Sequence, residues 1–396
     1  YGHTLIFLFL GGFLLAAAMQ RWGLHKRIAL RIVTFVGTSP GGIIVGFMAA
    51  TAFLSMWISN TATTIMMFAV GLSVIEFIAQ KAPDRLMVRN FGVALMLGIA
   101  YSASIGGVGT LVGSPPNALL AAFAQERFGV EVGFAKWMAI GLPVVLIMLP
   151  LAWLLLTRVT CPVSRRPIPG ADEVIRDELK ALGPMTIEEK RVLAIFVLTA
   201  LSWIFRPLIT MAFPGMGLTD SGIALIGALS LFIIPTTKGI GTSLLTWNRA
   251  VSLPWGVLLL FGGGLSLAEA ISRSGLADIV GRGLVGLEGF PTIVLVVAVA
   301  TLIVFLTEIT SNTATTAVFL PIVATVAVSA GIAPLELIIP VALAASCAFM
   351  MPVATPPNAI IFSSEKLTVA QMAKAGFLLN LIAISVIVFI TWALVI

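Results

Sequence analysis

Long apolar segments separated by short polar stretches fill most of this chain. An α-helix rises about 1.5 Å per residue, so about 20 apolar residues are needed to cross about 30 Å of hydrocarbon. Segments that approach or exceed this length lie at roughly 4–20, 41–58, 61–79, 91–125, 137–157, 190–212, 219–235, 253–272, 292–309, 313–330, 335–362 and 375–396. The pattern predicts an all-α polytopic membrane protein.

One polar stretch, 158–191, divides the chain into residues 1–157 and 192–396. It holds seven basic and six acidic residues, and its prolines and glycines predict loops at both ends. Residues Ala171–Leu182 within it are expected to form a short surface helix. We therefore expect a cytoplasmic linker between two membrane-embedded halves.

The two halves repeat each other in sequence. The hexapeptide Ser-Asn-Thr-Ala-Thr-Thr at 59–64 recurs unchanged at 311–316, and Pro-Pro-Asn-Ala at 115–118 recurs at 356–359. A pair of glycines precedes each hexapeptide at nearly equal distance, at 11–12 and at 262–263. Three matches in the same order indicate an internal repeat.

Each hexapeptide interrupts a very long apolar run, 41–79 or 292–330. Irregular polar backbone at membrane depth is tolerated only where protein or a water-filled cavity surrounds it. We therefore predict two re-entrant hairpins, each made of two half-membrane helices that meet at a polar tip. The Pro-Pro-Asn stretches predict broken helices at 91–125 and 335–362, because proline removes a donor and clashes with the preceding turn.

The positions of Lys and Arg predict the orientation. If the hairpins do not cross and the first helix runs inward, the inside loops hold 18 of the 23 basic residues and the outside loops five. This distribution obeys the positive-inside rule. Five crossings then separate the hairpins, so they enter from opposite sides. That is an inverted repeat, an architecture of many secondary transporters.

Composition narrows the class of protein. Hydrophobic residues make up 59% of the chain and charged residues 10%, with a mean hydropathy of +1.11. These values exclude an ordinary soluble enzyme, a nucleic-acid-binding protein and a disordered scaffold. The net charge of +6 is interpreted as loop charge, and Cys161 and Cys347 have no metal-ligand spacing. Because the chain enters an apolar run directly after Tyr1, we infer that upstream sequence is missing.

The repeated motifs favour a site for an anion together with a small cation. Windows 41–80, 90–126 and 283–365 contain no Lys or Arg, and their polar groups are mostly hydroxyls, amides and backbone. Oxygens at broken-helix ends suit an alkali cation, and helix N-termini suit an anion. Without a fixed cationic side chain, a dianion needs bound Na⁺ to balance its charge.

Paired Ser-Asn-Thr tips, each followed by a Pro-Pro-Asn break, resemble the divalent-anion/sodium symporter family over nearly the whole chain. The resemblance implies a homodimer in which a transport domain slides like an elevator against a scaffold. It implies transport of di- or tricarboxylates, or of sulfate, with several Na⁺. The family has eleven spanning helices and two hairpins. Eight helices are counted here, which suggests that three scaffold helices are missing upstream.

The resemblance also implies roles for particular residues. The first sodium site would use Ser55, Ser59, Asn60 and the backbone of Gly113, and the second would use Thr307, Asn312 and the backbones of Thr310 and Ala354. Asn60, Thr61, Asn312 and Thr313 would contact the substrate carboxylates, together with Ser114, Pro115, Thr355 and Pro356. No organic cofactor is expected.

We therefore expect an inner-membrane, Na⁺-coupled symporter of small dicarboxylates such as succinate, malate or fumarate. Sulfate, citrate and Na⁺-independent exchange remain alternatives. An ion channel would need a continuous pore lined by rings of charge or carbonyls. An intramembrane enzyme would need a nucleophile–base pair or a metal cluster near the motifs.

Simpler interpretations apply to several residues. A single Ser-Asn-Thr would be interpreted as polar residues that mediate packing between helices, and only its duplication favours a binding site. Glu308 has Met56 as its counterpart in the first copy, so we expect a structural partner or a water-facing position rather than an ion ligand. The basic cluster of Arg21, Lys26, Arg27 and Arg31 is expected on a surface helix at the lipid headgroups.

Overall fold

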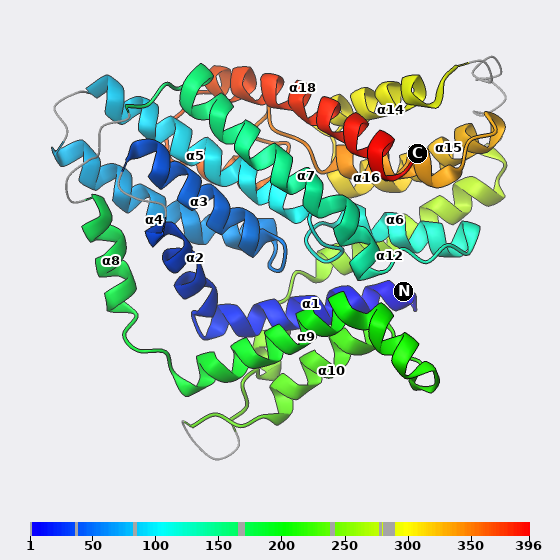
Figure 1. The fold of residues 1–396 in the computed structure, drawn as a ribbon, viewed down its shortest axis with the longest axis horizontal. Helices are drawn as coiled ribbons and strands as arrows, with labels where there is room; N and C mark the ends of the chain where they lie inside the picture. The colour runs from blue at the N-terminus through cyan, green and yellow to red at the C-terminus, as the bar shows by residue number, and fades with distance from the viewer. Residues whose placement is uncertain are drawn as a thin grey trace.

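The computed structural model describes residues 2–35, 39–81, 85–164, 171–237, 242–276, 279 and 290–396. Within these ranges its regular structure is helical, apart from one isolated bridge between Pro235 and Ser243 (Figure 1). Seven of the described helices are long and apolar enough to cross a membrane. They are α1 (Thr4–Arg21), α4 (Asn60–Lys81), α5 (Arg85–Gly107), α7 (Phe134–Leu154) with its π-helical extension η1 (Leu155–Thr160), α9 (Ile187–Ala212), α15 (Asn312–Ser329) and α18 (Val369–Leu394).

The first predicted hairpin contains α3 (Pro40–Ser55) and α4, which meet at a non-helical tip. Helix α3 begins where the Ser39 hydroxyl accepts a hydrogen bond from the Gly42 amide at 3.1 Å. With 16 residues α3 is about 24 Å long, whereas α4 with 22 residues is about 33 Å. The two arms therefore differ from the expected pair of half-membrane helices, since α4 is long enough to span.

The second predicted hairpin contains α14 (Thr292–Leu306) and α15, with a tip between them. These helices have 15 and 18 residues, which corresponds to about 22 and 27 Å. Helix α15 just reaches the length of a membrane span, whereas α14 falls short of it.

Both Pro-Pro-Asn stretches break a helix, and both breaks lie in the core. Helix α5 ends at Gly107 and α6 (Pro115–Phe128) begins after seven residues, while α16 (Pro334–Ala345) is followed by α17 (Pro356–Phe362). Each second helix begins with proline, where its missing N–H has no intrahelical partner to lose. Every residue from Phe91 to Gly107 is buried, and so is every residue from Leu337 to Ala345. The central helices therefore lead directly into the breaks.

The helices form two groups. The outer group consists of α1, α9 and α10 (Asp220–Ile233), and we include α12 (Trp255–Arg273), which packs on α1 and also on α15 and α6. The inner group consists of both hairpins, both broken helices, α7 and α18. Figure 1 shows α1, α9 and α10 together along one edge, away from α14, α16 and α18. Helix α1 approaches α10 so closely that a Cβ at Gly11 would lie 2.7 Å from the Ala224 backbone. The remaining short elements are η2 (Pro214–Met216) and α11 (Trp247–Ala250).

The polar linker is more helical than expected at its ends. Its central helix is α8 (Ala171–Ala181), as predicted, but η1 extends to Thr160 and α9 already begins at Ile187. Helix α9 starts with a capping box between Thr186 and Glu189.

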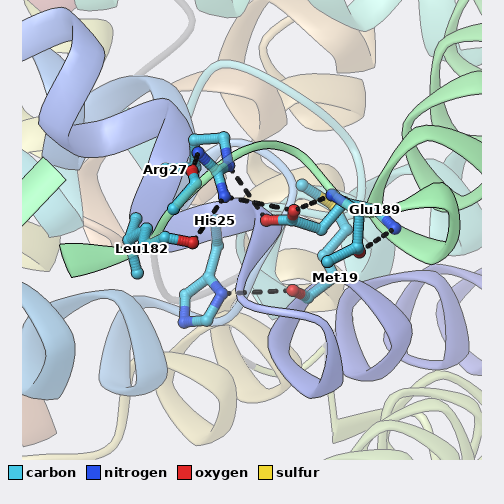
Figure 2. Close-up of polar contacts among 7 residues, drawn as sticks. Met19, His25, Arg27, Leu182 and Glu189 are labelled. Carbon is cyan, nitrogen blue, oxygen red and sulfur yellow. Dashed lines mark hydrogen bonds and ion pairs between the residues drawn. The ribbon is translucent and has the colours of Figure 1, made fainter. Parts of the chain in front are cut away.

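The basic cluster near the first helix is only partly at the surface. Its helix, α2 (Leu24–Thr34), exists as predicted, and Arg31 is exposed. Arg27 is instead buried, with 5% of its surface exposed, and its Nε lies 3.0 Å from Glu189 Oε1 (Figure 2). It also donates to the carbonyls of Leu182 and Gly183 at 3.2 and 2.8 Å. The expectation of headgroup contact was therefore wrong for Arg27, whose charge is paired inside the protein. The pattern near Arg27 could not show this, because its partner Glu189 lies 162 residues away in sequence.

Candidate functional site

The tip of the first hairpin is fixed to the helix α5 behind it. The Ser55 hydroxyl lies 2.5 Å from Asn60 Oδ1 and 2.7 Å from the Ala103 carbonyl. Ser55 is completely buried, and Asn60 is the first residue of α4. The Asn60 amide oxygen is thus held at the start of a helix in the interior.

The second tip repeats this arrangement. The Thr307 hydroxyl lies 2.7 Å from Asn312 Oδ1 and 3.0 Å from the Ala345 carbonyl oxygen, in hydrogen-bond contact with both. Asn312 is the first residue of α15, and Thr307 is completely buried. The sequence repeat is therefore a repeat of hydrogen bonds, with threonine in place of serine.

Both tips and both breaks line one cavity of about 840 Å³. The cavity includes every residue that the sequence predicted to contact substrate, which are Asn60, Thr61, Ser114, Pro115, Asn312, Thr313, Thr355 and Pro356. Its opposite wall comes from the outer group, through α1 and the segment 252–257 before and within α12. Segments that are about 250 residues apart in sequence thus converge on one space.

The cavity wall carries no formal charge. Among the described residues that line it there is no Asp, Glu, Lys, Arg or His, and its polar side chains are Ser, Thr, Asn and Gln20. Helices α4 and α15 begin at the cavity wall, and their first backbone N–H groups lack intrahelical acceptors. Helices α6 and α17 also begin there, each with two prolines that have no N–H group. Each helix start carries about half a positive charge, which favours an anion without a basic side chain.

The residues predicted to bind Na⁺ form two layers. Ser59, Gly113, Thr310 and Ala354 line the cavity, as Asn60 and Asn312 do, whereas Ser55 and Thr307 lie directly behind, bonded to those asparagines. The donor set is therefore composed of neutral oxygens from hydroxyl, amide and backbone groups. Such oxygens at unwound helix ends are the ligands that alkali cations take in transporters.

Gly107 shows how closely the groups of the first candidate cation site are packed. A Cβ placed there would lie 2.8 Å from Asn60 Oδ1 and 3.0 Å from the Gly113 carbonyl oxygen. Asn60 Oδ1 and the Gly113 carbonyl oxygen, two proposed ligands, therefore both lie close beside the Gly107 backbone, where a side chain would collide with them. The neutral oxygens of these groups fit a small cation, and Ala348 stands at the place of Gly107 in the second repeat.

Glu308 follows Thr307 in the second tip and is not duplicated. Its carboxylate accepts hydrogen bonds from the amides of Phe349, Met350 and Met351 at 2.7 to 3.0 Å, and from Asn380 Nδ2 at 2.8 Å. It thereby ties the tip to the second break and to α18. These contacts agree with the structural role expected from the sequence.

The structure adds residues that the motifs did not single out. Gln20 and Ser252 face the cavity from the outer group, and neither belongs to a repeated motif. Asn117 and Asn358, the last residues of the Pro-Pro-Asn stretches, are completely buried behind the breaks. Their duplication was visible in the sequence, although no role was assigned to their side chains.

Comparisons with known proteins agree with this architecture. A family model described as the sodium:sulfate symporter transmembrane region matches residues 1–396. The chain is 46% identical over 402 residues to the sodium-dependent dicarboxylate transporter SdcS of Staphylococcus saprophyticus, covering 100% of this chain and 77% of that protein. It is 45% identical over 399 residues to SdcS of Staphylococcus aureus strain USA300, covering 99% and 76%.

A solved structure shares the fold at low sequence identity. The YdaH transporter of Alcanivorax borkumensis superposes with a TM-score of 0.57 and 11% identity, over 98% of this chain and 84% of that one. The chain is therefore an integral, multi-pass membrane protein of the sodium:sulfate symporter family, the divalent-anion/sodium symporters that its repeated motifs resembled.

Proposed function

We propose that this protein is a secondary transporter that moves small dicarboxylates, such as succinate, malate or fumarate, into the cytoplasm together with Na⁺. One observation carries the proposal: two repeated tips and two repeated breaks share a cavity whose described lining holds no charged side chain. The similarity to relatives named sodium-dependent dicarboxylate transporters supports both the substrate class and the cation.

Electrostatics explains the coupling. A dianion in this cavity meets partial charges from helix starts but no fixed cation, so its transfer from water is unfavourable. A Na⁺ about 4 Å from a carboxylate contributes about 4 kcal/mol at an effective dielectric constant of about 20. Na⁺ held by Asn60, Gly113 and Ser59, or by Asn312, Thr310 and Ala354, would supply that charge. Anion affinity would then depend on the Na⁺ concentration.

The proposed motion is an elevator-like sliding of the inner group against the outer group. The cavity lies between the two groups, so a shift of one against the other would carry the site across the membrane. We further propose a homodimer in an inner membrane, with the 158–191 linker cytoplasmic. The proposal is transport without chemical change of the solute, so substrate should be recovered intact after uptake.

The test is uptake of labelled succinate into proteoliposomes with and without a Na⁺ gradient. Na⁺-driven accumulation that unlabelled malate inhibits supports the proposal. Stronger inhibition by sulfate or citrate would shift the substrate class, and uptake unaffected by Na⁺ but driven by internal dicarboxylate would indicate exchange. Single-channel currents far above carrier turnover rates would overturn the proposal.

A further inference from the structure

Two buried asparagines close the loops at the helix breaks. Asn117 and Asn358 are each the third residue of the helix after a break, and neither has exposed surface. Asn117 Nδ2 donates to the Gly107 carbonyl at 2.9 Å and to the Thr110 carbonyl at 2.8 Å. Asn358 Nδ2 donates to Ala348 at 3.2 Å and to Met351 at 3.0 Å.

These bonds hold backbone carbonyls of the two breaks, and two of these carbonyls, those of Thr110 and Met351, also accept the amides of Gly113 and Ala354 at 3.4 and 3.2 Å. When a helix ends, its last carbonyls lose their intrahelical donors, and leaving them unpaired in a buried place is costly. In the first repeat one amide pairs the carbonyl of Gly107, the last residue of α5, with that of Thr110. In the second repeat the amide pairs the carbonyls of Ala348 and Met351, which follow the end of α16 at Ala345. The side chain therefore sets the curvature of the loop that leads to Gly113 or to Ala354.

The loop geometry matters directly at the first candidate cation site. The point where Gly107 lacks a Cβ is 3.0 Å from the Gly113 carbonyl oxygen and 2.8 Å from Asn60 Oδ1. A Cβ at Gly113 would in turn lie 2.6 Å from the Gly107 carbonyl oxygen, which is the acceptor of the Asn117 amide. A shift of the Gly107 carbonyl thus displaces the proposed ligand at Gly113.

Among the described residues, the side-chain amide of each asparagine makes hydrogen bonds only through Nδ2, so these bonds set its orientation. Asn117 Oδ1 and Asn358 Oδ1 are both buried without a hydrogen-bond partner among the described residues. A residue kept only to fill space would not need two donors directed at two carbonyls in both repeats. The duplication of the contacts, in loops 108–114 and 349–355 that share only Val112 and Val353, indicates that the donors themselves are required.

We propose that Asn117 and Asn358 are positioning residues for the two cation sites, and that each holds the carbonyl of Gly113 or Ala354 in its ligand position. This inference rests on the proposed function, because it assumes that Na⁺ binds at those carbonyls. Loss of the amide should therefore weaken Na⁺ binding more than substrate binding.

The test compares Asn117→Leu and Asn358→Leu with the wild-type protein. Two quantities are measured: the Na⁺ concentration for half-maximal succinate uptake, and the KM for succinate at saturating Na⁺. We expect the first to rise about tenfold, as for the loss of one or two buried hydrogen bonds, while KM changes less than about twofold. Asn90→Leu is the matched control, since the exposed Asn90 amide donates to a single carbonyl, that of Pro162, at 3.1 Å. It should leave both quantities unchanged.

A second readout separates this inference from the proposed function. Na⁺-induced thermal stabilisation in detergent, measured without any dicarboxylate, should be present in the wild type and reduced in both leucine variants. If the wild type is stabilised by Na⁺ but does not take up succinate, the proposed function fails and the positioning role is still tested. If Na⁺ does not stabilise the wild type, the positioning role is overturned.

If the leucine variants do not fold, Asn117→Asp and Asn358→Asp replace them, because they keep the volume but place an acceptor against two carbonyls. Unchanged Na⁺ dependence of uptake and unchanged Na⁺ stabilisation in folded variants would overturn the inference. A rise in succinate KM with an unchanged Na⁺ requirement would do the same, because it would assign these residues to the substrate.

Discussion

Single residues decide whether a cation can bind beside the cavity, and Gly107 shows this most directly because it contacts two proposed ligands. A methyl group at this position would lie 2.8 Å from Asn60 Oδ1 and 3.0 Å from the Gly113 carbonyl, closer than carbon atoms normally approach. Both neighbours are themselves restrained, Asn60 by Ser55 and the loop by Asn117. The site therefore has little freedom to adjust.

We predict that Gly107→Ala lowers Na⁺-driven succinate uptake at least about tenfold, because the methyl would push the Asn60 amide and the Gly113 carbonyl out of their proposed ligand positions. The measurement is initial uptake rate against Na⁺ concentration in proteoliposomes. Gly98→Ala in the same helix is the control, since its methyl would meet the flexible side chain of Met48 at 3.1 Å and Ile44 only at an ordinary 3.6 Å. Wild-type Na⁺ dependence in Gly107→Ala would remove the first site from this position.

The two tip asparagines make a paired prediction. Asn60→Ala and Asn312→Ala should each abolish uptake, since each removes an amide oxygen at a cation site and a group that lines the cavity. Both variants should still fold, because the tips keep the hydrogen bonds from Ser55 and Thr307 to Ala103 and Ala345. Size-exclusion chromatography checks folding, and labelled uptake checks function. Robust Na⁺-driven uptake in either variant would contradict a paired site.

At this scale the sequence predicted the residues that repeat and missed those that do not. The duplicated motifs placed all eight predicted contacts on the cavity wall, because two copies of one local structure face each other. Gln20 and Ser252 come from the opposite wall and from no motif, so only the packing of the outer group identifies them. The hydrogen bonds that Asn117 and Asn358 donate depend on how the loops at the breaks fold back, which the spacing of residues in the sequence does not show.

Helix positions were predictable where the length of an apolar run sets where a helix begins and ends. The apolar runs located the N-termini of α1, α9 and α15 to within a few residues. Helix α18 begins six residues before its apolar run, because a capping box at Thr368 starts it earlier. The unequal arms of the first hairpin were not predictable, since α3 ends three residues before its apolar run 41–58 does and α4 continues two residues past its run 61–79. Helix ends are set by caps and tertiary contacts as much as by hydropathy.

The ion pair of Arg27 and Glu189 gives the element-scale prediction. It joins α2 to the first turn of α9, and both side chains are about 5% exposed. Arg27→Ala leaves a buried carboxylate with one charged partner fewer, so unfolding free energy should fall by about 3–5 kcal/mol. Replacing both residues, as Arg27→Met with Glu189→Leu, should recover much of that loss, because no buried charge is left unpaired.

Thermal or denaturant unfolding in detergent compares the three proteins. The exposed pair of Lys180 and Asp177 is the control, since breaking it with Lys180→Ala should change stability by less than about 1 kcal/mol. A double variant as unstable as Arg27→Ala would contradict the role of the unpaired charge and would assign the effect to the hydrogen bonds that Arg27 donates to the Leu182 and Gly183 carbonyls.

The whole molecule is divided between an outer and an inner group, and specific contacts join them on the side away from the linker. The segment before α7 belongs to the inner group, and its Glu131 pairs with Arg206 of α9 at 2.5 Å. Arg206 also lies 2.9 Å from Asp220 of α10, whose carboxylate accepts a hydrogen bond from the Phe134 amide. Phe134 stacks on Trp203 of α9 with ring centroids 4.6 Å apart.

An elevator-like motion cannot preserve these contacts. Hydrogen bonds and ion pairs lose their geometry within about 1 Å of displacement, so sliding the inner group past α9 must break the cluster around Arg206. The contacts inside one group should persist through the cycle. One such contact is the hydrogen bond from the Asn90 amide of α5 to the Pro162 carbonyl at 3.1 Å, because Pro162 directly follows η1, the extension of α7.

This difference gives a prediction for cross-linking. In a protein whose Cys161 and Cys347 are replaced by alanine, Glu131→Cys with Arg206→Cys joins the two groups when a short, reducible bifunctional reagent is added. Succinate uptake should fall in proportion to the cross-linked fraction and return on reduction, because the inner group can no longer move. Asn90→Cys with Pro162→Cys, treated identically, should retain uptake, since its cross-link lies within one body. Na⁺-induced thermal stabilisation should persist in both, because neither cross-link touches the cavity. Undiminished uptake with the Glu131 and Arg206 positions fully cross-linked would show that substrate crosses the membrane without relative movement of the two groups.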